Sequence, residues 1–246
     1  MFDIFSKKKF LIDYLEGLVD IHNHILPGID DGAKTVEESL ELIKTFSEFG
    51  IRSFIATPHI MHNYYPNDAN TINTSLTLLK NGLLMNEVKD VSIKVAAEHM
   101  VDANFEAILE RREVMPMEKN YLLIEMSYLQ ASINFNDAIQ KIAVHRYFPI
   151  LAHPERYVYL HNRMGKYRKY KESGILFQLN LLSLSEFYGK NVQQAAFKLL
   201  DEGLVDYVAS DVHNMNQLQN LKEIKITPKM LDKLIPVIER TIQSFS

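Results

Sequence analysis

Short apolar runs alternate with longer amphipathic stretches along this chain of 246 residues. The length of the runs and their aliphatic content predict seven buried strands. These strands are expected within residues 18–24, 51–59, 91–99, 121–126, 148–156, 175–180 and 205–213. Helical periodicity is expected at about 36–49, 68–87, 134–147, 164–173, 190–202 and 228–244, with a short helix plus loop at 102–118.

Strands that alternate with helices predict a parallel sheet covered by helices. Thr35 and Glu38 fit a capping box at the start of the first helix, and Gly50 supplies its stop. Seven strands indicate an α/β fold with a closed or nearly closed barrel. A doubly wound nucleotide-binding sheet is disfavoured, because no Gly-x-Gly-x-x-Gly follows any strand. We expect one domain over residues 1–246. Its N-terminal extension, residues 1–18, is expected to dock on the barrel bottom or on a partner, or else to form a frayed tail.

Polar side chains follow most of the predicted strands. In barrels of alternating strand and helix, the carboxyl ends of the strands form the active face. The chain places histidine, acidic and arginine residues there, which predicts an enzyme with a metal site at that face. These residues are His22, His24, His59, Glu98, Glu125, His153, Arg156, Asp211 and His213.

The residues themselves leave some roles open. His22 and His24 lie two apart, so both can bind one metal, or both can be exposed beside a turn. Asp30-Asp31-Gly32 reads first as a plain turn that caps a helix.

A carboxylate at the end of a buried strand is costly unless it is paired, hydrogen-bonded or bound to metal, so Glu98 and Glu125 each need a partner. His99 should point away from Glu98 and is expected to be structural or exposed. Arg156 suits a phosphate, because its planar fork donates two parallel hydrogen bonds, and the alternative is a surface ion pair with Glu155.

Composition narrows the chemistry. The chain has no cysteine, which excludes disulfides, thiolate metal sites and cysteine nucleophiles. A net charge of −4 offers no electrostatic footprint for nucleic acid. No window approaches the roughly 18 consecutive apolar residues that a membrane span needs, and Asp13 and Glu16 interrupt the run that a secretory signal would require. We therefore expect a cytoplasmic protein.

These motifs, with Thr57-Pro58-His59 and His153-Pro-Glu-Arg156, resemble the polymerase-and-histidinol-phosphatase (PHP) superfamily over residues 19–214. Within it, Asp30-Asp31-Gly32 and the Ala-His-Pro-Glu-Arg segment are most similar to bacterial manganese-dependent tyrosine phosphatases of the CpsB/YwqE type. The resemblance implies a distorted (β/α)7 barrel and three divalent ions, manganese first, with iron or zinc as alternatives. It revises the interpretation of Asp31 from a turn residue to a ligand. The implied ligand sets are His22, His24, Glu98 and Asp211; Glu98, Glu125 and His153; and Asp31, His59 and His213.

The implied activity is hydrolysis of phosphotyrosine by a metal-bridging hydroxide, with Arg156 holding the phosphate. The implied partner is a bacterial tyrosine kinase of capsule or exopolysaccharide export. Five neutral imidazoles and four carboxylates around three divalent ions leave a formal charge of +2, which suits a phosphate dianion. His62, Tyr64 and Tyr65 either line the substrate entrance or are ordinary loop residues.

Two other functions stay open. A small-molecule phosphatase, such as one that cleaves histidinol phosphate, would need acidic groups for the substrate ammonium. A non-catalytic, metal-dependent regulatory module is disfavoured by the intact ligand set. Amidohydrolases share His-x-His, but they typically add a carbamylated lysine, and no lysine follows a matching strand here.

Overall fold

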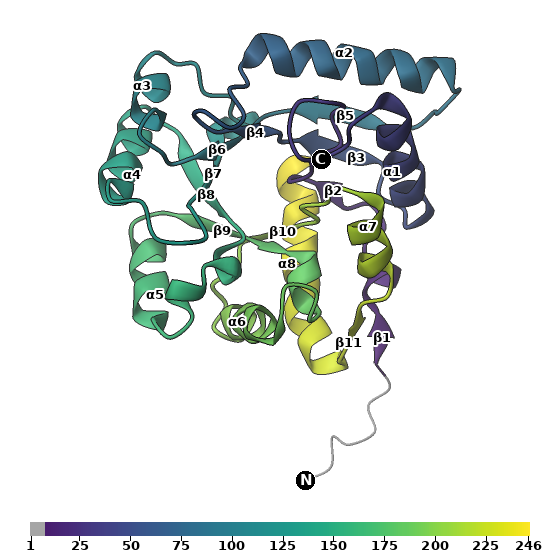
Figure 1. Cartoon of the computed structure of the whole chain (residues 1–246). Helices are drawn as coiled ribbons and strands as arrows, with labels where there is room; N and C mark the ends of the chain where they lie inside the picture. The colour runs from purple at the N-terminus through teal and green to yellow at the C-terminus, as the bar shows by residue number, and fades with distance from the viewer. Residues whose placement is uncertain (1–7) are drawn as a thin grey trace.

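Parallel strands form the centre of the structure, a computed structural model that describes residues 8–246 (Figure 1). One sheet has the order β10-β9-β8-β7-β6-β4, and the other has the order β2-β3-β5. Two residues separate β3 from β4 and β5 from β6, so the sheets continue into each other. Backbone bonds from Asp211 N to His22 O (2.7 Å) and from His24 N to Val212 O (3.0 Å) close the ring. The predicted parallel barrel with outer helices is confirmed.

The barrel strands are β2 (Val19–Asp20), β3 (Ser53–Ala56), β4 (His59–Ile60), β5 (Ser92–Val95), β6 (Glu98–Met100), β7 (Tyr121–Glu125), β8 (Phe148–Ala152), β9 (Leu176–Asn180) and β10 (Tyr207–Ala209). The helices are α1 (Val36–Glu48), α2 (Ala69–Met85), α3 (Phe105–Glu110), α4 (Phe135–Val144), α5 (Met164–Glu172), α6 (Lys190–Asp201), α7 (Met215–Lys222) and α8 (Pro228–Phe245). All the predicted helices are present, and α7 is an additional one. No helix within residues 8–246 is long and apolar enough to cross a bilayer.

The second and third predicted strands are each interrupted, which distorts the barrel. Pro58 has no backbone N–H to give to a ladder, and the N–H of Thr57 donates to the carbonyl of Asn23 (3.0 Å). In the other break, the N–H of Ala97 donates to the carbonyl of Met115 (3.1 Å). Each interruption lies just before a candidate ligand, so the strand restarts with that ligand at the mouth of the barrel.

Side chains alternate between the inside of the barrel and the helices outside it. On β7, Leu123 belongs to a small inner cluster, whereas Leu122 and Ile124 belong to the large core under the helices. Glu125 has the same parity as Leu123, so the strand carries it to the barrel mouth. Phe245 from α8 joins the inner cluster. A packed interior below a polar mouth is the arrangement that positions the site.

The N-terminal extension docks on its own chain from residue 8 onward. β1 (Lys9–Phe10) pairs antiparallel with β11 (Lys225–Ile226), and Leu11 and Leu15 are fully buried. The alternative of a frayed tail is therefore wrong for residues 8–18. Residues 1–7 of the predicted extension lie outside the described residues.

Candidate metal centre and active site

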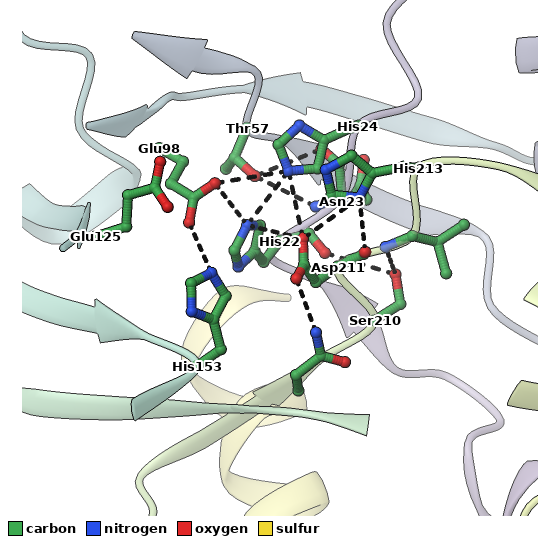
Figure 2. Close-up of polar contacts among 12 residues, drawn as sticks. His22, Asn23, His24, Thr57, Glu98, Glu125, His153, Ser210, Asp211 and His213 are labelled. Atoms are coloured by element: carbon green, nitrogen blue, oxygen red, sulfur yellow. Dashed lines mark hydrogen bonds and ion pairs between the residues drawn. The ribbon is translucent and has the colours of Figure 1, made fainter. Parts of the chain in front are cut away.

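The barrel mouth brings together all nine side chains that the resemblance implies as ligands. Most of these side chains are drawn in Figure 2, where imidazoles and carboxylates from different strands point toward one another. Four overlapping groups have ligand atoms close enough to hold a cation: His24, Asp31, His59 and His213; His22, His24 and Asp211; His22, Glu98 and His153; and His59, Glu98 and Glu125. The fold thus brings these residues together from the ends of six strands and the loops that follow them.

The grouping differs in part from the implied ligand sets. Glu98 lies between groups, as a bridging ligand would, because its Oε2 is 3.1 Å from His22 Nε2 and 3.0 Å from His59 Nδ1. Its Oε1 is 3.1 Å from His153 Nε2. Glu125 Oε1 lies beside His59 Nδ1 (3.1 Å) and forms no close group with His153. His59 therefore faces two groups, because its Nε2 is also 3.4 Å from Asp31 Oδ1.

Hydrogen bonds behind the histidines set which ring nitrogen faces the centre. His22 Nδ1 lies 2.8 Å from Gln178 Oε1, and His24 Nδ1 lies 2.7 Å from Asp30 Oδ2. Both oxygens accept, so each Nδ1 donates and each Nε2 is the ring nitrogen that faces the centre. The two Nε2 atoms are 3.4 Å apart, a distance at which both can bind one cation. Fixing the tautomer in this way is the usual arrangement behind metal-binding histidines.

Two adjacent aspartates have different roles. Asp30 is buried and accepts from His24 Nδ1, Gly32 N (2.8 Å) and His59 N (3.2 Å). The half-exposed side chain of Asp31 faces His59 and lies 3.5 Å from His213 Nε2. Asp31 is thus placed where a ligand would be, and Asp30 is a positioning residue that the sequence analysis missed. A buried carboxylate in a turn directly after a strand was the available signal.

Buried polar atoms at the centre fit a metal. Glu98 Oε2, Glu125 Oε1 and His59 Nδ1 are buried, and none of them has a well-oriented hydrogen-bond partner among residues 8–246. Such atoms are costly to bury unless something else satisfies them. Burial tends to raise the pKa of Glu98, but the neighbouring His22 and His59 outweigh it and hold that pKa well below its usual range. The Glu98 carboxylate is therefore ionised, and the nitrogen and oxygen donor set around it suits divalent ions.

Neighbouring charged groups also shift the pKa values of the site histidines. Burial alone would lower the pKa of His24, but Asp30 and Asp211 raise it to about 10. Burial and the nearby His24 lower the pKa of His213 to about 4. The rings of His24 and His213, which stack at 3.9 Å, thus have opposite pKa shifts.

Two candidate ligands have left-handed backbone conformations. His153 has φ 34° and Asp211 has φ 53°, values that cost a residue with a side chain of order 1 kcal/mol or more. Both residues come directly after a strand or close to its end. The left-handed turn ends the ladder and directs each side chain toward the barrel mouth.

Arg156 lies beside the centre, in the short helical turn after β8. Its Nη1 donates to Asp211 Oδ2 (2.8 Å), and its guanidinium lies between the rings of Tyr128 and Tyr188. The alternative interpretation, an ion pair of Arg156 with Glu155, is wrong, because no such pair is present within the described residues. Glu155 is buried, and its Oε1 accepts from Ser183 Oγ (2.7 Å). Burial raises the pKa of Glu155.

A cavity of about 1210 Å³ opens above these residues. His62, Tyr64 and Tyr65 all line it, which favours their placement at the substrate entrance, and the ring of Tyr65 stacks on His59 at 5.4 Å. His99 lies apart from the centre, as expected. Its Nδ1 donates to the carbonyl of Leu123 (3.0 Å), and its Nε2 accepts from the N–H of Met115 (3.1 Å).

Comparison with known proteins agrees with this geometry. The family model described as capsular polysaccharide synthesis, CpsB/CapC, matches residues 18–234. The chain belongs to the CpsB/CapC family. CapC of Staphylococcus aureus is 30% identical over 218 residues, which are 85% of this chain and 84% of CapC. The tyrosine-protein phosphatase YwqE of Bacillus subtilis is 28% identical over 199 residues, 80% of this chain and 78% of YwqE. These matches confirm the predicted family.

Solved structures support the same assignment. A structure from work on YwqE and on CpsB of Streptococcus pneumoniae, described as metal-dependent tyrosine phosphatases, has a TM-score of 0.81 at 25% identity. The match covers 93% of this chain and 94% of that one. A lactonase of Listeria monocytogenes, at TM-score 0.55 and 11% identity, covers 95% of this chain and 93% of the lactonase, and it shares the fold alone. Homologues in the CpsB/CapC family are thus metal-dependent tyrosine-protein phosphatases on a barrel of this kind.

Proposed function

We propose that this chain is a metal-dependent phosphatase that hydrolyses phosphotyrosine in a protein. The observation that carries the proposal is the convergence of nine residues with nitrogen and oxygen donors, most of which line an open cavity. Among them, Glu98 and Glu125 have buried oxygens without a well-oriented hydrogen bond within residues 8–246. Membership of a family whose relatives are named tyrosine-protein phosphatases supports the same reaction. The partner proposed is a bacterial tyrosine kinase of capsule or exopolysaccharide export, in the cytoplasm.

The cofactor proposed is three divalent ions, with manganese first and iron or zinc as alternatives. Glu98 would bridge, since both of its oxygens face imidazole nitrogens. The other holders would be His22, His24, Asp31, His59, Glu125, His153, Asp211 and His213. Bound divalent ions would supply a water of lowered pKa and neutralise the charge of the phosphate.

Arg156 would bind the phosphate oxygens. Its guanidinium has five N–H donors, one of which is used by Asp211, and the side chain lines the cavity. Neighbouring rings restrict its rotation, so the remaining donors are already oriented before substrate arrives. The leaving group from phosphotyrosine is a phenolate of pKa about 10, which needs less protonation than an alkoxide. The site therefore does not require a dedicated acid.

A histidinol phosphatase would need a carboxylate available for the ammonium of its substrate. Apart from the candidate ligands, the acidic residue that lines the cavity in the described part of the chain is Asp102. Its carboxylate already accepts from the backbone N–H groups of His62 (2.8 Å), Asn104 (2.8 Å) and Phe105 (3.1 Å). This occupied carboxylate disfavours the small-molecule alternative.

Phosphate release from the manganese-loaded protein tests the proposal. A phosphotyrosine peptide and histidinol phosphate are compared, each with and without a chelator. The proposal predicts chelator-sensitive release from the peptide and little from histidinol phosphate. Preference for histidinol phosphate would contradict it, and release that survives metal removal would contradict the metal-dependent reaction.

A further inference from the structure

Large apolar side chains gather around the cavity on its solvent side. Leu129 is 90% exposed, Ile133 is 101% exposed, and both line the cavity together with Tyr64 and Tyr128. Exposed single apolar residues are ordinary on a protein surface, but several that share the rim of one cavity are typical of a binding surface. We refer to residues 128–133, which follow β7, as the lip.

The lip is held in place at both ends. The carbonyl of Ser127 accepts from the hydroxyl of Tyr159 (3.1 Å), and the hydroxyl of Ser132 donates to the carbonyl of Val101 (2.6 Å). Leu129 and Ile133 lie between or next to these anchors. The loop geometry therefore fixes their exposure. Binding of a partner would then cost little conformational entropy in the lip.

The rim carries little charge that is not already used. Once the candidate ligands are set aside, the charged side chains that line the cavity in residues 8–246 are Arg156 and Asp102. Arg156 donates to Asp211, and Asp102 accepts from backbone N–H groups. The lip thus offers apolar contact rather than ion pairs, which selects apolar side chains in whatever binds there.

We propose that the lip binds apolar side chains on either side of the phosphotyrosine in a peptide segment of the substrate protein. This inference rests on the proposed phosphatase function and deepens it. The cavity exceeds the roughly 300–1,000 Å³ of typical small-molecule pockets at about 1210 Å³, and it runs without interruption from the candidate ligands to the lip. A phosphotyrosine side chain at the centre would leave its neighbours in the chain beside Leu129 and Ile133.

The experiment compares three substrates: p-nitrophenyl phosphate and two phosphotyrosine peptides that differ only in having leucine or serine beside the phosphotyrosine. The variants are Leu129→Ser and Ile133→Ser. Leu84→Ser on α2 is the matched control, because Leu84 is 79% exposed and does not line the cavity. The ratio of kcat/KM for the leucine peptide to that for p-nitrophenyl phosphate should fall about fivefold in each lip variant, since partial burial of one side chain is lost. In the control the ratio should not change.

Each outcome decides the inference. If the ratio of kcat/KM for the leucine peptide to that for p-nitrophenyl phosphate is the same in the lip variants as in the control, the lip does not bind the peptide. Provided that the unsubstituted enzyme is active, the phosphatase function would then still stand. Equal kcat/KM for the two peptides in the unsubstituted enzyme would also overturn it. If sedimentation showed that the only effect of the lip variants is to dissociate a dimer, the lip would bind a second copy of this chain. That result would contradict the proposal that the lip binds a substrate peptide. No phosphate release from any of the three substrates would overturn the proposed function and this inference with it.

The Cζ of Arg156 lies 4.5 Å from the ring centroid of Tyr128 and 4.2 Å from that of Tyr188, so the guanidinium contacts two aromatic rings. Tyr188 lies before α6, outside the cavity lining, and its buried hydroxyl lies near Asn180 without a well-oriented hydrogen bond among residues 8–246. The contact of Tyr188 with Arg156 is therefore made by its ring.

We infer that Tyr188 is a positioning residue that acts through Arg156. Contact with both rings restricts the guanidinium, which bonds Asp211 and also lines the cavity. This inference also rests on the proposed function, because it assigns to Tyr188 the orientation of a phosphate-binding group. Removing the ring face should cost about tenfold in kcat/KM, whereas removing the hydroxyl alone should cost little.

A double-mutant cycle tests this inference with p-nitrophenyl phosphate. Tyr188→Leu should lower kcat/KM about tenfold, and Tyr188→Phe should restore it. In an Arg156→Ala background, Tyr188→Leu should have no further effect. A loss of the same size in both backgrounds would show a merely structural role, and activity of Tyr188→Leu equal to the unsubstituted enzyme would also overturn the inference. No effect of Arg156→Ala itself would contradict the proposed phosphate contact and the role of Tyr188 together.

Discussion

Asp30→Ala tests whether groups behind the ligands set the metal affinity of the candidate centre. The Asp30 carboxylate accepts from His24 Nδ1 at 2.7 Å, from Gly32 N at 2.8 Å and from His59 N at 3.2 Å. Alanine removes all three bonds, so the His24 ring can rotate and the turn that carries Asp31 loses its anchor. Loss of one such partner typically costs 10- to 100-fold in metal affinity. Because Asp30 contacts two candidate ligands, we expect about 100-fold, which equals about 2.8 kcal/mol.

Calorimetric titration of manganese into chelator-treated protein measures this affinity directly. Asp68→Ala is the matched control, because Asp68 caps α2 by accepting from the N–H groups of Asn70 and Thr71 (2.8 and 2.9 Å) and does not line the cavity. Loss of a helix cap costs about 1 kcal/mol of stability. The control should therefore unfold at lower temperature with its metal affinity unchanged. If Asp30→Ala bound manganese within twofold of the unsubstituted protein, the positioning role of Asp30 would be refuted.

Three further predictions concern stability. Gly32→Ala should lower the melting temperature and the metal affinity, because a Cβ at Gly32 would lie 2.1 Å from the carbonyl oxygen of His24 and the chain must shift; an unchanged melting curve would contradict this. Burial lowers the pKa of His99 to about 4, so the unfolded chain binds more protons between pH 4 and 6.5, and stability rises with pH there by up to about 3 kcal/mol. His99→Gln keeps one donor and one acceptor but does not titrate. In urea unfolding, the rise of its free energy of unfolding with pH should be smaller than in the unsubstituted protein, and an equal rise would contradict the prediction. Chelation should lower the melting temperature, since a metal at 100 times its Kd stabilises by about 2.7 kcal/mol, and identical curves with and without metal would oppose a bound cofactor.

The position of the site was predictable from sequence because its side chains sit next to apolar runs. A parallel barrel gathers all strand ends at one mouth, so His22, Glu98, Glu125 and His153 could be brought together without knowing any long-range contact. The breaks in the second and third strands were only partly foreseeable. Pro58 signals one of them, whereas the other depends on pairing between Ala97 and Met115, which no local pattern encodes.

Residues that act at a distance in sequence were missed. Gln178 lies 156 residues from His22, yet its carbonyl oxygen fixes the tautomer of that histidine. A polar residue in the apolar β9 was a usable signal, because it needs a partner once buried. Tyr188 gave no signal, since an aromatic residue in a loop is common and its stacking on Arg156 depends on tertiary structure. The pairing of β1 with β11 was missed for the same reason, because strands of two residues have no periodicity to detect.

The most direct test of the account is phosphate release from a phosphotyrosine peptide as manganese is titrated into chelator-stripped protein. The account predicts no release from the stripped protein and a rise in rate that follows metal binding. It also predicts that Glu98→Gln, which alters the carboxylate shared by the candidate groups, abolishes the rise. Release that is independent of added metal, or a full rise in Glu98→Gln, would contradict the claim that these strand-end residues form a metal-dependent phosphatase site.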